Sequence, residues 1–160
     1  KVSIKIRSVH NNENLTNLLS IKGAKLLENS ILNFANNLIK VISQPNLGIT
    51  YANKIFREDE IIDWNRKAYE IINQIRALSP FPGAKCRINE ETIKIIDAEV
   101  IDNNDELDNG SIIGNTIIIK CAENAIKVNV LQRPGKKIMS SKEVLNGWKV
   151  IKGQKMQIIN

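Results

Sequence analysis

Two periods of apolar residues follow each other along the first forty positions. Residues 2–7 alternate strictly between apolar and polar side chains, which predicts a half-buried strand. Asn11 or Asn12 then offers an N-cap, and leucines, isoleucines and a phenylalanine recur at helical spacing to about Lys40, with Gly23 between two helical pieces. One strand and a broken helix cannot bury their apolar faces alone, so we expect this segment to be the end of a larger α/β unit.

The pattern changes after residue 41. Pro45 and Gly48 predict an extended linker over residues 42–52, and a second unit follows at residues 53–160. Its first element is a predicted helix over residues 66–78, with an apolar stripe at helical spacing, Asn65 as the N-cap and two prolines beyond its end.

Beyond that helix the apolar period becomes two. Short segments rich in isoleucine and valine are separated by turn residues, which predicts strands near residues 84–88, 92–101, 111–113, 116–122 and 125–131. The S-x-x-E spacing of Ser140 and Glu143 predicts a capping box and a short helix to about Asn146, closed by Gly147. The second unit is therefore predicted to be mainly β, a small OB-like barrel with one or two helices.

Composition agrees with a folded protein. Hydrophobic residues make up 42% of the 160 residues and charged residues 25%, as in globular domains. The sequence contains neither a run of roughly 20 apolar residues nor the long apolar region of a signal peptide, so we expect a cytoplasmic protein. Cys86 and Cys121 lack metal-ligand spacing and are interpreted as core thiols; no metal is expected. The abundance of Ile, Asn and Lys is typical of an AT-rich, bacterial genome.

Charge is distributed unevenly around the net value of +6. Residues 88–123 carry nine acids against two lysines, whereas residues 133–160 carry seven cations against Glu143 alone. The acidic stretch would repel a polyanion, and the basic tail is the natural place for phosphates to dock. On charge alone, a merely solvated basic face is an equal alternative.

Four motifs occur in an order and spacing that carry a family resemblance. They are Thr50-Tyr51-Ala52-Asn53-Lys54; Ile62-Asp63-Trp64; Gln74-Ile75-Arg76-Ala77-Leu78 with Pro80, Pro82 and Gly83; and Leu131-Gln132-Arg133-Pro134-Gly135-Lys136-Lys137 with Met139. Together they resemble the C-terminal domain of methionyl-tRNA formyltransferases. Residues 1–41 resemble the closing strand and helix of that family's Rossmann-like catalytic domain.

The resemblance implies a reaction in translation initiation and one-carbon metabolism. These enzymes transfer formyl from 10-formyltetrahydrofolate to the amino group of methionyl initiator tRNA, using an Asn, a His and an Asp of the N-terminal domain. His10 does not match that catalytic context, so no catalytic residue is expected in this chain, and the folate donor is not expected to bind it alone. We expect this piece by itself to be inactive and its catalytic half to lie upstream of Lys1.

The resemblance and the charge pattern together predict a tRNA-binding surface for initiator methionyl-tRNA. Lys136 and Lys137 follow a Pro-Gly turn, where two ammonium groups can reach phosphates. Lys54 and Arg57, at the end of the linker, are a second pair that could guide the acceptor arm. The remaining candidates extend the basic tail: Arg133, Lys142, Lys149 and Lys152.

Four further residues or segments receive structural interpretations. Trp64 is expected to be a core anchor, Asp63 to accept from backbone donors, and Arg76 to pair with an acid such as Asp63 or Glu70. Because aromatic residues make up only 4%, we expect phosphate contacts and RNA shape rather than base stacking to dominate binding. Apolar faces on residues 1–40 are expected to drive self-association.

Two other functions stay open. The chain could belong to a related formyltransferase that acts on a sugar nucleotide or a folate, which predicts negligible affinity for tRNA. It could also be a free-standing OB-type RNA-binding module with no enzyme attached.

Overall fold

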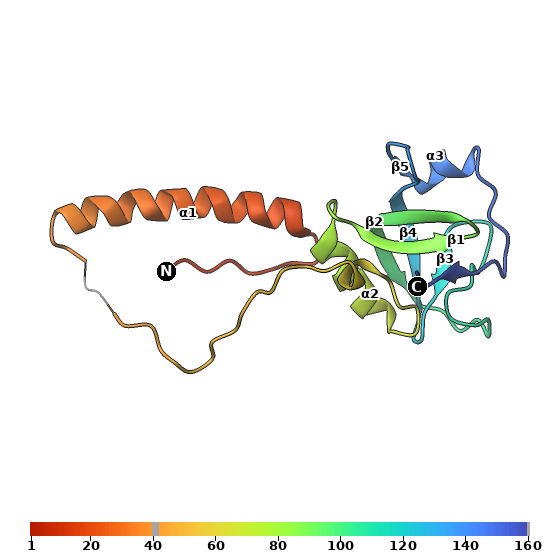
Figure 1. Cartoon of the computed structure of the whole chain (residues 1–160), viewed down its shortest axis with the longest axis horizontal. Coiled ribbons are helices and arrows are strands. Elements are labelled where there is room, and N and C mark those ends of the chain that lie inside the picture. The colour runs from red at the N-terminus through yellow and green to blue at the C-terminus, as the bar shows by residue number, and fades with distance from the viewer. Residues whose placement is uncertain (40–41, 160) are drawn as a thin grey trace. The chain divides into compact units, whose positions relative to one another are not determined.

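The computed structural model describes residues 1–39 and 42–159. The chain divides into two compact units, Lys1–Ile55 and Phe56–Asn160 (Figure 1). The predicted boundary after residue 41 falls outside the described residues. No helix or strand is assigned over residues 42–57, which contain the predicted linker.

The first unit consists of one long helix and extended chain. Helix α1 (Asn12–Ala35) begins at the N-cap Asn11, whose side chain accepts from the Asn14 backbone N–H at 3.0 Å. The predicted break at Gly23 is wrong, because α1 runs through this residue and a single glycine costs a helix only about 1 kcal/mol. The prediction of helix as far as Lys40 is also too long within the described residues, and Lys40 itself lies outside them.

The predicted strand over residues 2–7 is absent from the structure. Alternation is necessary for a half-buried strand, but a strand also needs a neighbour to bond its backbone, and this segment pairs with none of the strands in the described residues. Neither α1 nor another helix in the described part of the chain is long and apolar enough to cross a membrane.

The second unit opens with a 3₁₀ turn, η1 (Glu58–Glu60), and helix α2 (Ala68–Leu78). Helix α2 begins two residues later than predicted, because Asn65 does not cap it. The Asn65 backbone N–H donates to Asp63 Oδ1 at 3.0 Å, and Glu70 Oε2 accepts from the Lys67 N–H at 3.1 Å. The predicted role of Asp63 as a backbone acceptor is confirmed.

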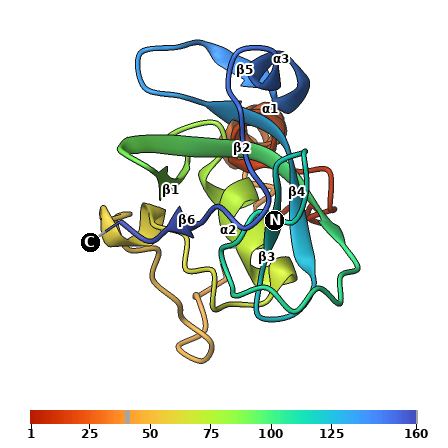
Figure 2. The same ribbon diagram turned by 90° about the vertical axis from the view of Figure 1, so that its right-hand side faces the viewer.

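Six strands form one antiparallel sheet. Their bounds are β1 (Ala84–Ile88), β2 (Glu91–Ile101), β3 (Ile118–Lys120), β4 (Ala125–Gln132), β5 (Ile138–Ser140) and β6 (Met156–Gln157). The order is β3-β4-β2-β1-β6, with β5 also paired to β4. The sheet curls into a small, nearly closed barrel, with β5 and helix α3 (Ser141–Leu145) together at one end (Figure 2). The predicted mainly β, OB-like fold is confirmed.

The barrel encloses one apolar core. It includes the buried stripe of α2, and Trp64 is only 2% exposed, so its predicted role as a core anchor is confirmed. Cys86 and Cys121 are buried free thiols, as predicted. Burial raises the pKa of Cys121 to about 11 and that of Cys86 further.

Candidate functional site

The turn between β4 and β5 presents two lysines to solvent. The Lys136 backbone N–H donates to the Arg133 carbonyl at 3.1 Å, and Gln132 Nε2 donates to the Lys136 carbonyl at 2.9 Å. Gly135 adopts a φ of +66°, a conformation that glycine reaches without steric cost. The turn is therefore held by its backbone and by the Gln132 side chain, and the side chains of Lys136 and Lys137 are exposed to solvent.

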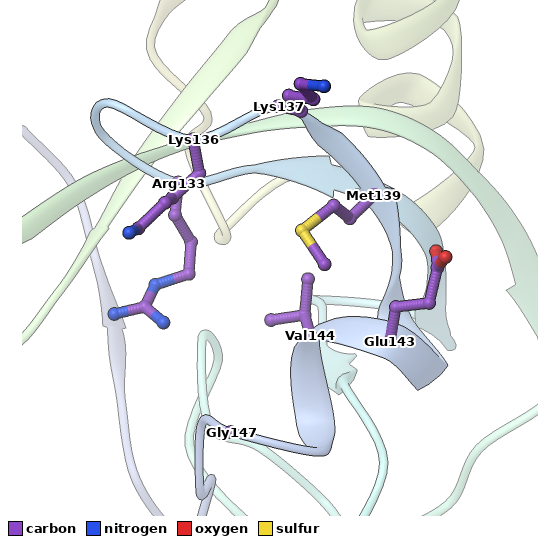
Figure 3. A pocket seen from close by; sticks show the side chains of 7 residues that line it. All are labelled: Arg133, Lys136, Lys137, Met139, Glu143, Val144 and Gly147. Carbon is purple, nitrogen blue, oxygen red and sulfur yellow. The ribbon is translucent and has the colours of Figure 1, made fainter.

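A pocket of about 280 Å³ lies beside this turn (Figure 3). Its lining residues are Arg133, Lys136, Lys137, Met139, Glu143, Val144 and Gly147. The Met139 and Val144 side chains provide an apolar wall, while Arg133 and Lys136 lie across from them on the turn. Such a mixture of cations and apolar surface suits a phosphate attached to an organic group.

Arg133 is engaged within the protein. Its Nε donates to Glu91 Oε2 at 2.9 Å and its Nη2 to Glu91 Oε1 at 2.6 Å, and its guanidinium lies 4.9 Å from the Trp148 ring centroid. The hydrogen bond from Arg133 lowers the pKa of Glu91, and the same bond raises the pKa of Arg133. A guanidinium in this bidentate geometry is already neutralised, so it adds little charge to the surface.

Other tail cations are also paired with the acidic stretch. Lys152 Nζ lies 3.4 Å from Asp105 Oδ2, and Lys155 Nζ lies 2.8 Å from Asp108 Oδ2. The pKa of Asp105 is lowered mainly by the Leu107 backbone N–H and also by Lys152, and that of Asp108 by Lys155. Residues of the acidic and basic segments, which are separate in sequence, thus form ion pairs with each other in the folded domain.

Four candidate cations of the basic tail make no ion pair with a described residue: Lys136, Lys137, Lys142 and Lys149. Glu143, the one acid of the tail, is committed to capping α3. Its Oε2 accepts from the Ser140 backbone N–H at 2.8 Å and from the Ser140 hydroxyl at 2.6 Å, which lowers the pKa of Glu143. The capping box predicted here is confirmed.

These four lysines do not all face one pocket. Lys136 and Lys137 line the pocket beside Arg133, whereas Lys142 lines a separate pocket of about 390 Å³ together with Lys127. Lys149 is exposed and follows Trp148, the ring on which Arg133 lies.

Lys54 and Arg57 are both exposed, but Lys54 belongs to the first unit and Arg57 to the second.

Lys94 is a cation of this region that the sequence interpretation missed. It sits on β2 opposite Gln132 of β4 and lines a pocket of about 240 Å³ with Arg133, Pro134 and Gly135. In sequence, Lys94 is one of the two lysines within the acidic stretch, so the sequence does not associate it with the basic tail. The signal that finds it is strand register, because the pairing of β2 with β4 carries Lys94 to the base of the turn.

Comparison with known proteins decides the family. Residues 54–149 match the family model for the formyl transferase C-terminal domain. The chain belongs to this family. It is 35% identical over 140 residues to a methionyl-tRNA formyltransferase of Rickettsia africae, covering 88% of this chain and 46% of the relative. It is 38% identical over 149 residues to that of Bartonella tribocorum, covering 91% and 48%. The chain thus spans about half the length of the curated relatives it matches, and the resemblance inferred from the four motifs is confirmed.

Solved structures agree on the fold of this formyl transferase domain. A crystal structure of a HypX variant from Aquifex aeolicus matches with a TM-score of 0.67 at 13% identity, covering 95% of this chain and 31% of that one. HypX from the same organism in complex with tetrahydrofolic acid matches with a TM-score of 0.57 at 15% identity, covering 82% and 26%.

The pocket beside the turn does not fit a folate. A pterin ring needs buried hydrogen-bonding groups along its edge. Buried polar side-chain atoms without a partner among the described residues include Trp64 Nε1, Gln74 Oε1 and Asn103 Nδ2, and none of these residues lines this pocket. The pocket beside the turn presents amines and a committed carboxylate instead. We therefore derive no chemical step through a folate from these residues.

His10 directly precedes Asn11, the N-cap of α1. His10 Nδ1 accepts from the Arg7 backbone N–H at 3.2 Å just before α1. The described residues contain no group of three or more His, Cys, Asp or Glu side chains that could hold a metal ion. Arg76 donates to Asn73 Oδ1 at 3.2 Å, and Glu70 pairs with Arg66 at 3.6 Å.

Proposed function

We propose that this chain is the tRNA-binding part of a methionyl-tRNA formyltransferase and holds initiator methionyl-tRNA through its β4–β5 turn. The observation that carries the proposal is the pair Lys136 and Lys137, exposed and without an acidic partner among the described residues, in a family member 35% identical to such enzymes. Ammonium groups that release counterions from phosphates supply most of the affinity of such surfaces.

The other candidate cations are ranked by whether an acidic residue of the domain pairs with them. Lys142 and Lys149 keep uncompensated charge and extend the proposed surface, together with Lys94. Arg133 and Lys152 are proposed to contribute through position rather than charge, because Glu91 and Asp105 already neutralise them. Lys54 and Arg57 are each retained as a further proposed phosphate contact, without a shared site.

The complete reaction is proposed for the enzyme of which this domain would form part. Formyl would pass from a folate donor, 10-formyltetrahydrofolate, to the methionyl amino group on catalytic residues outside this chain. The tetrahydrofolic acid bound by HypX, a structure of the same fold, supports a folate donor. A role in translation initiation would place the protein in the cytoplasm. We expect no formyl transfer by this chain alone.

Salt dependence of tRNA binding tests the proposal. The intact chain is titrated with initiator methionyl-tRNA between about 50 and 200 mM salt, and log affinity is plotted against log salt. We expect a steep, linear decline, because each lysine–phosphate contact releases counterions. A flat response or negligible affinity would reject the proposal and favour a related formyltransferase with a small substrate.

A further inference from the structure

An exposed aromatic ring lies at the end of α2. Phe81 is 76% exposed and stands between Pro80 and Pro82 in the turn that leads into β1. The pyrrolidine rings fix φ on both sides of Phe81, and the Gly83 backbone N–H closes the turn on the Leu78 carbonyl at 2.9 Å. Displaying an aromatic ring on a turn restrained in this way reduces the entropy that a ligand must overcome on binding.

Gly83 brings a cation onto this ring. It adopts a φ of +86°, and a Cβ at this position would lie only 3.0 Å from Lys94 Cδ. The absence of a side chain therefore lets the aliphatic stem of Lys94 lie against the turn. Its ammonium group stands 5.6 Å from the Phe81 ring centroid, within the range of a cation–π contact. Since the cation occupies one face of the ring and the residue is largely exposed, the other face is open to a ligand.

Lys94 also connects the ring to the proposed phosphate-binding turn. The pocket that Lys94 lines is also lined by Arg133, Pro134 and Gly135, the residues directly before Lys136 and Lys137. Arg133 lines both this pocket and the pocket of Lys136 and Lys137, so the half-buried Lys94 links the Phe81 ring to the exposed lysines of the turn.

We propose that Phe81 is a stacking platform for an unpaired nucleotide base of the bound RNA, whose phosphates contact Lys94 and the lysines of the β4–β5 turn. The inference rests on the proposed tRNA binding and deepens it. It adds one local stacking contact to the expectation that phosphate contacts and RNA shape dominate binding: one ring beside the lysines is enough to hold a base, because every base presents a π face.

The surroundings favour a nucleotide over a protein partner. A protein contact at an exposed phenylalanine is expected to continue over neighbouring apolar surface. Here the neighbouring pocket is lined by threonine, lysine, glutamine and arginine side chains together with a Pro-Gly turn. The Lys94 ammonium group beside a single aromatic ring matches an aromatic ligand that carries negative charge.

The test compares base-bearing and base-free RNA on the intact chain. One probe is an oligoadenylate of about eight nucleotides containing one 2-aminopurine, and the other is an abasic oligonucleotide with the same number of phosphates. The variants are Phe81→Leu, which keeps an apolar side chain, Phe81→Trp, which restores an aromatic one, and Lys136→Gln/Lys137→Gln. Thermal unfolding confirms that each variant is folded.

We expect the wild type to prefer the base-bearing probe by roughly 5- to 150-fold, the value of one stacked base. Phe81→Leu should lose this preference and the quenching of 2-aminopurine, and Phe81→Trp should recover both. The lysine variant should weaken both probes alike. Equal binding of the two probes would overturn the stacking site. A change of oligomeric state in Phe81→Leu, seen by sedimentation, would overturn it as well, because Phe81 would then contact protein. In either case, steep salt dependence of tRNA binding would leave the proposed function standing. Failure of the wild type to bind any RNA would reject both.

Discussion

Arg133 and Lys136 lie three positions apart on one turn, yet they differ in the charge they present. Glu91 holds Arg133 with two hydrogen bonds, whereas Lys136 meets no acid among the described residues. The sequence identifies both as cations of a basic tail, but it does not reveal that residues 42 positions apart form a pair. Sequence reasoning could therefore locate the basic region and not the residues within it that remain uncompensated.

Removing the partner should release Arg133 for RNA. We expect Glu91→Gln to steepen the plot of log affinity for tRNA against log salt by about one unit, because one more cation then displaces counterions. The matched control is Glu123→Gln, which makes the same change in net charge at the opposite end of β4, where Glu123 pairs with Lys67. An equal effect of both variants would mean that total charge, and not the release of Arg133, governs binding.

The same pair makes a signed prediction for pH. Because the folded pKa of Glu91 is lowered by Arg133, ionised Glu91 stabilises the fold above its unfolded pKa of about 4.3, and this stabilisation is lost as pH falls through the folded pKa. We expect the melting temperature to drop between about pH 5 and pH 3, and to drop less in Glu91→Gln. Parallel curves for the two proteins would contradict this role.

At the scale of elements, the helices and strands whose signals lie within their own sequence were predicted well. β1 has the predicted bounds, and α3 is capped by Ser140 and Glu143 as predicted. Two strands too short to show a pattern of their own were missed: β5 exists because it pairs with the neighbouring β4, and β6 because it pairs with the distant β1. The reverse error occurred at residues 2–7, where strand-like alternation meets no partner strand in the described part of the chain.

The absence of a side chain at Gly110 allows two distant segments of the barrel to approach each other closely. Gly110 has a φ of +82°, and a Cβ there would lie 2.7 Å from the Met156 carbonyl oxygen, against backbone that cannot turn aside. We expect Gly110→Ala to lower the free energy of unfolding by about 2 kcal/mol or more, measured by urea denaturation. Gly147→Ala is the control, since a Cβ there meets nothing within 4 Å. Comparable stability of the two variants would refute the close approach.

At the scale of the whole molecule, the net charge of +6 does not show which cations are paired within the protein and which are available to a ligand. The acidic stretch neutralises Arg133, Lys152 and Lys155 within the barrel, which leaves the proposed binding charge on the turn and its neighbours.

Self-association through residues 1–40 stays a prediction. Helix α1 has no buried residue, and large apolar side chains such as Leu27, Ile31 and Phe34 are exposed on it. Exposed apolar surface of this extent is expected to find a partner. Sedimentation velocity should show a dimer or a larger species, and a monomer at all concentrations would count against the prediction.

The central claim is that unpaired lysines of one turn, and not the basic tail as a whole, bind tRNA. The most direct measurement compares the salt dependence of initiator tRNA binding for Lys136→Gln/Lys137→Gln and for Lys152→Gln/Lys155→Gln. Both variants remove two positive charges, but the second pair is already neutralised by Asp105 and Asp108. We predict that the slope becomes shallower by about 1.5 in the first variant and changes little in the second. Equal changes in both, or none in the first, would contradict the account.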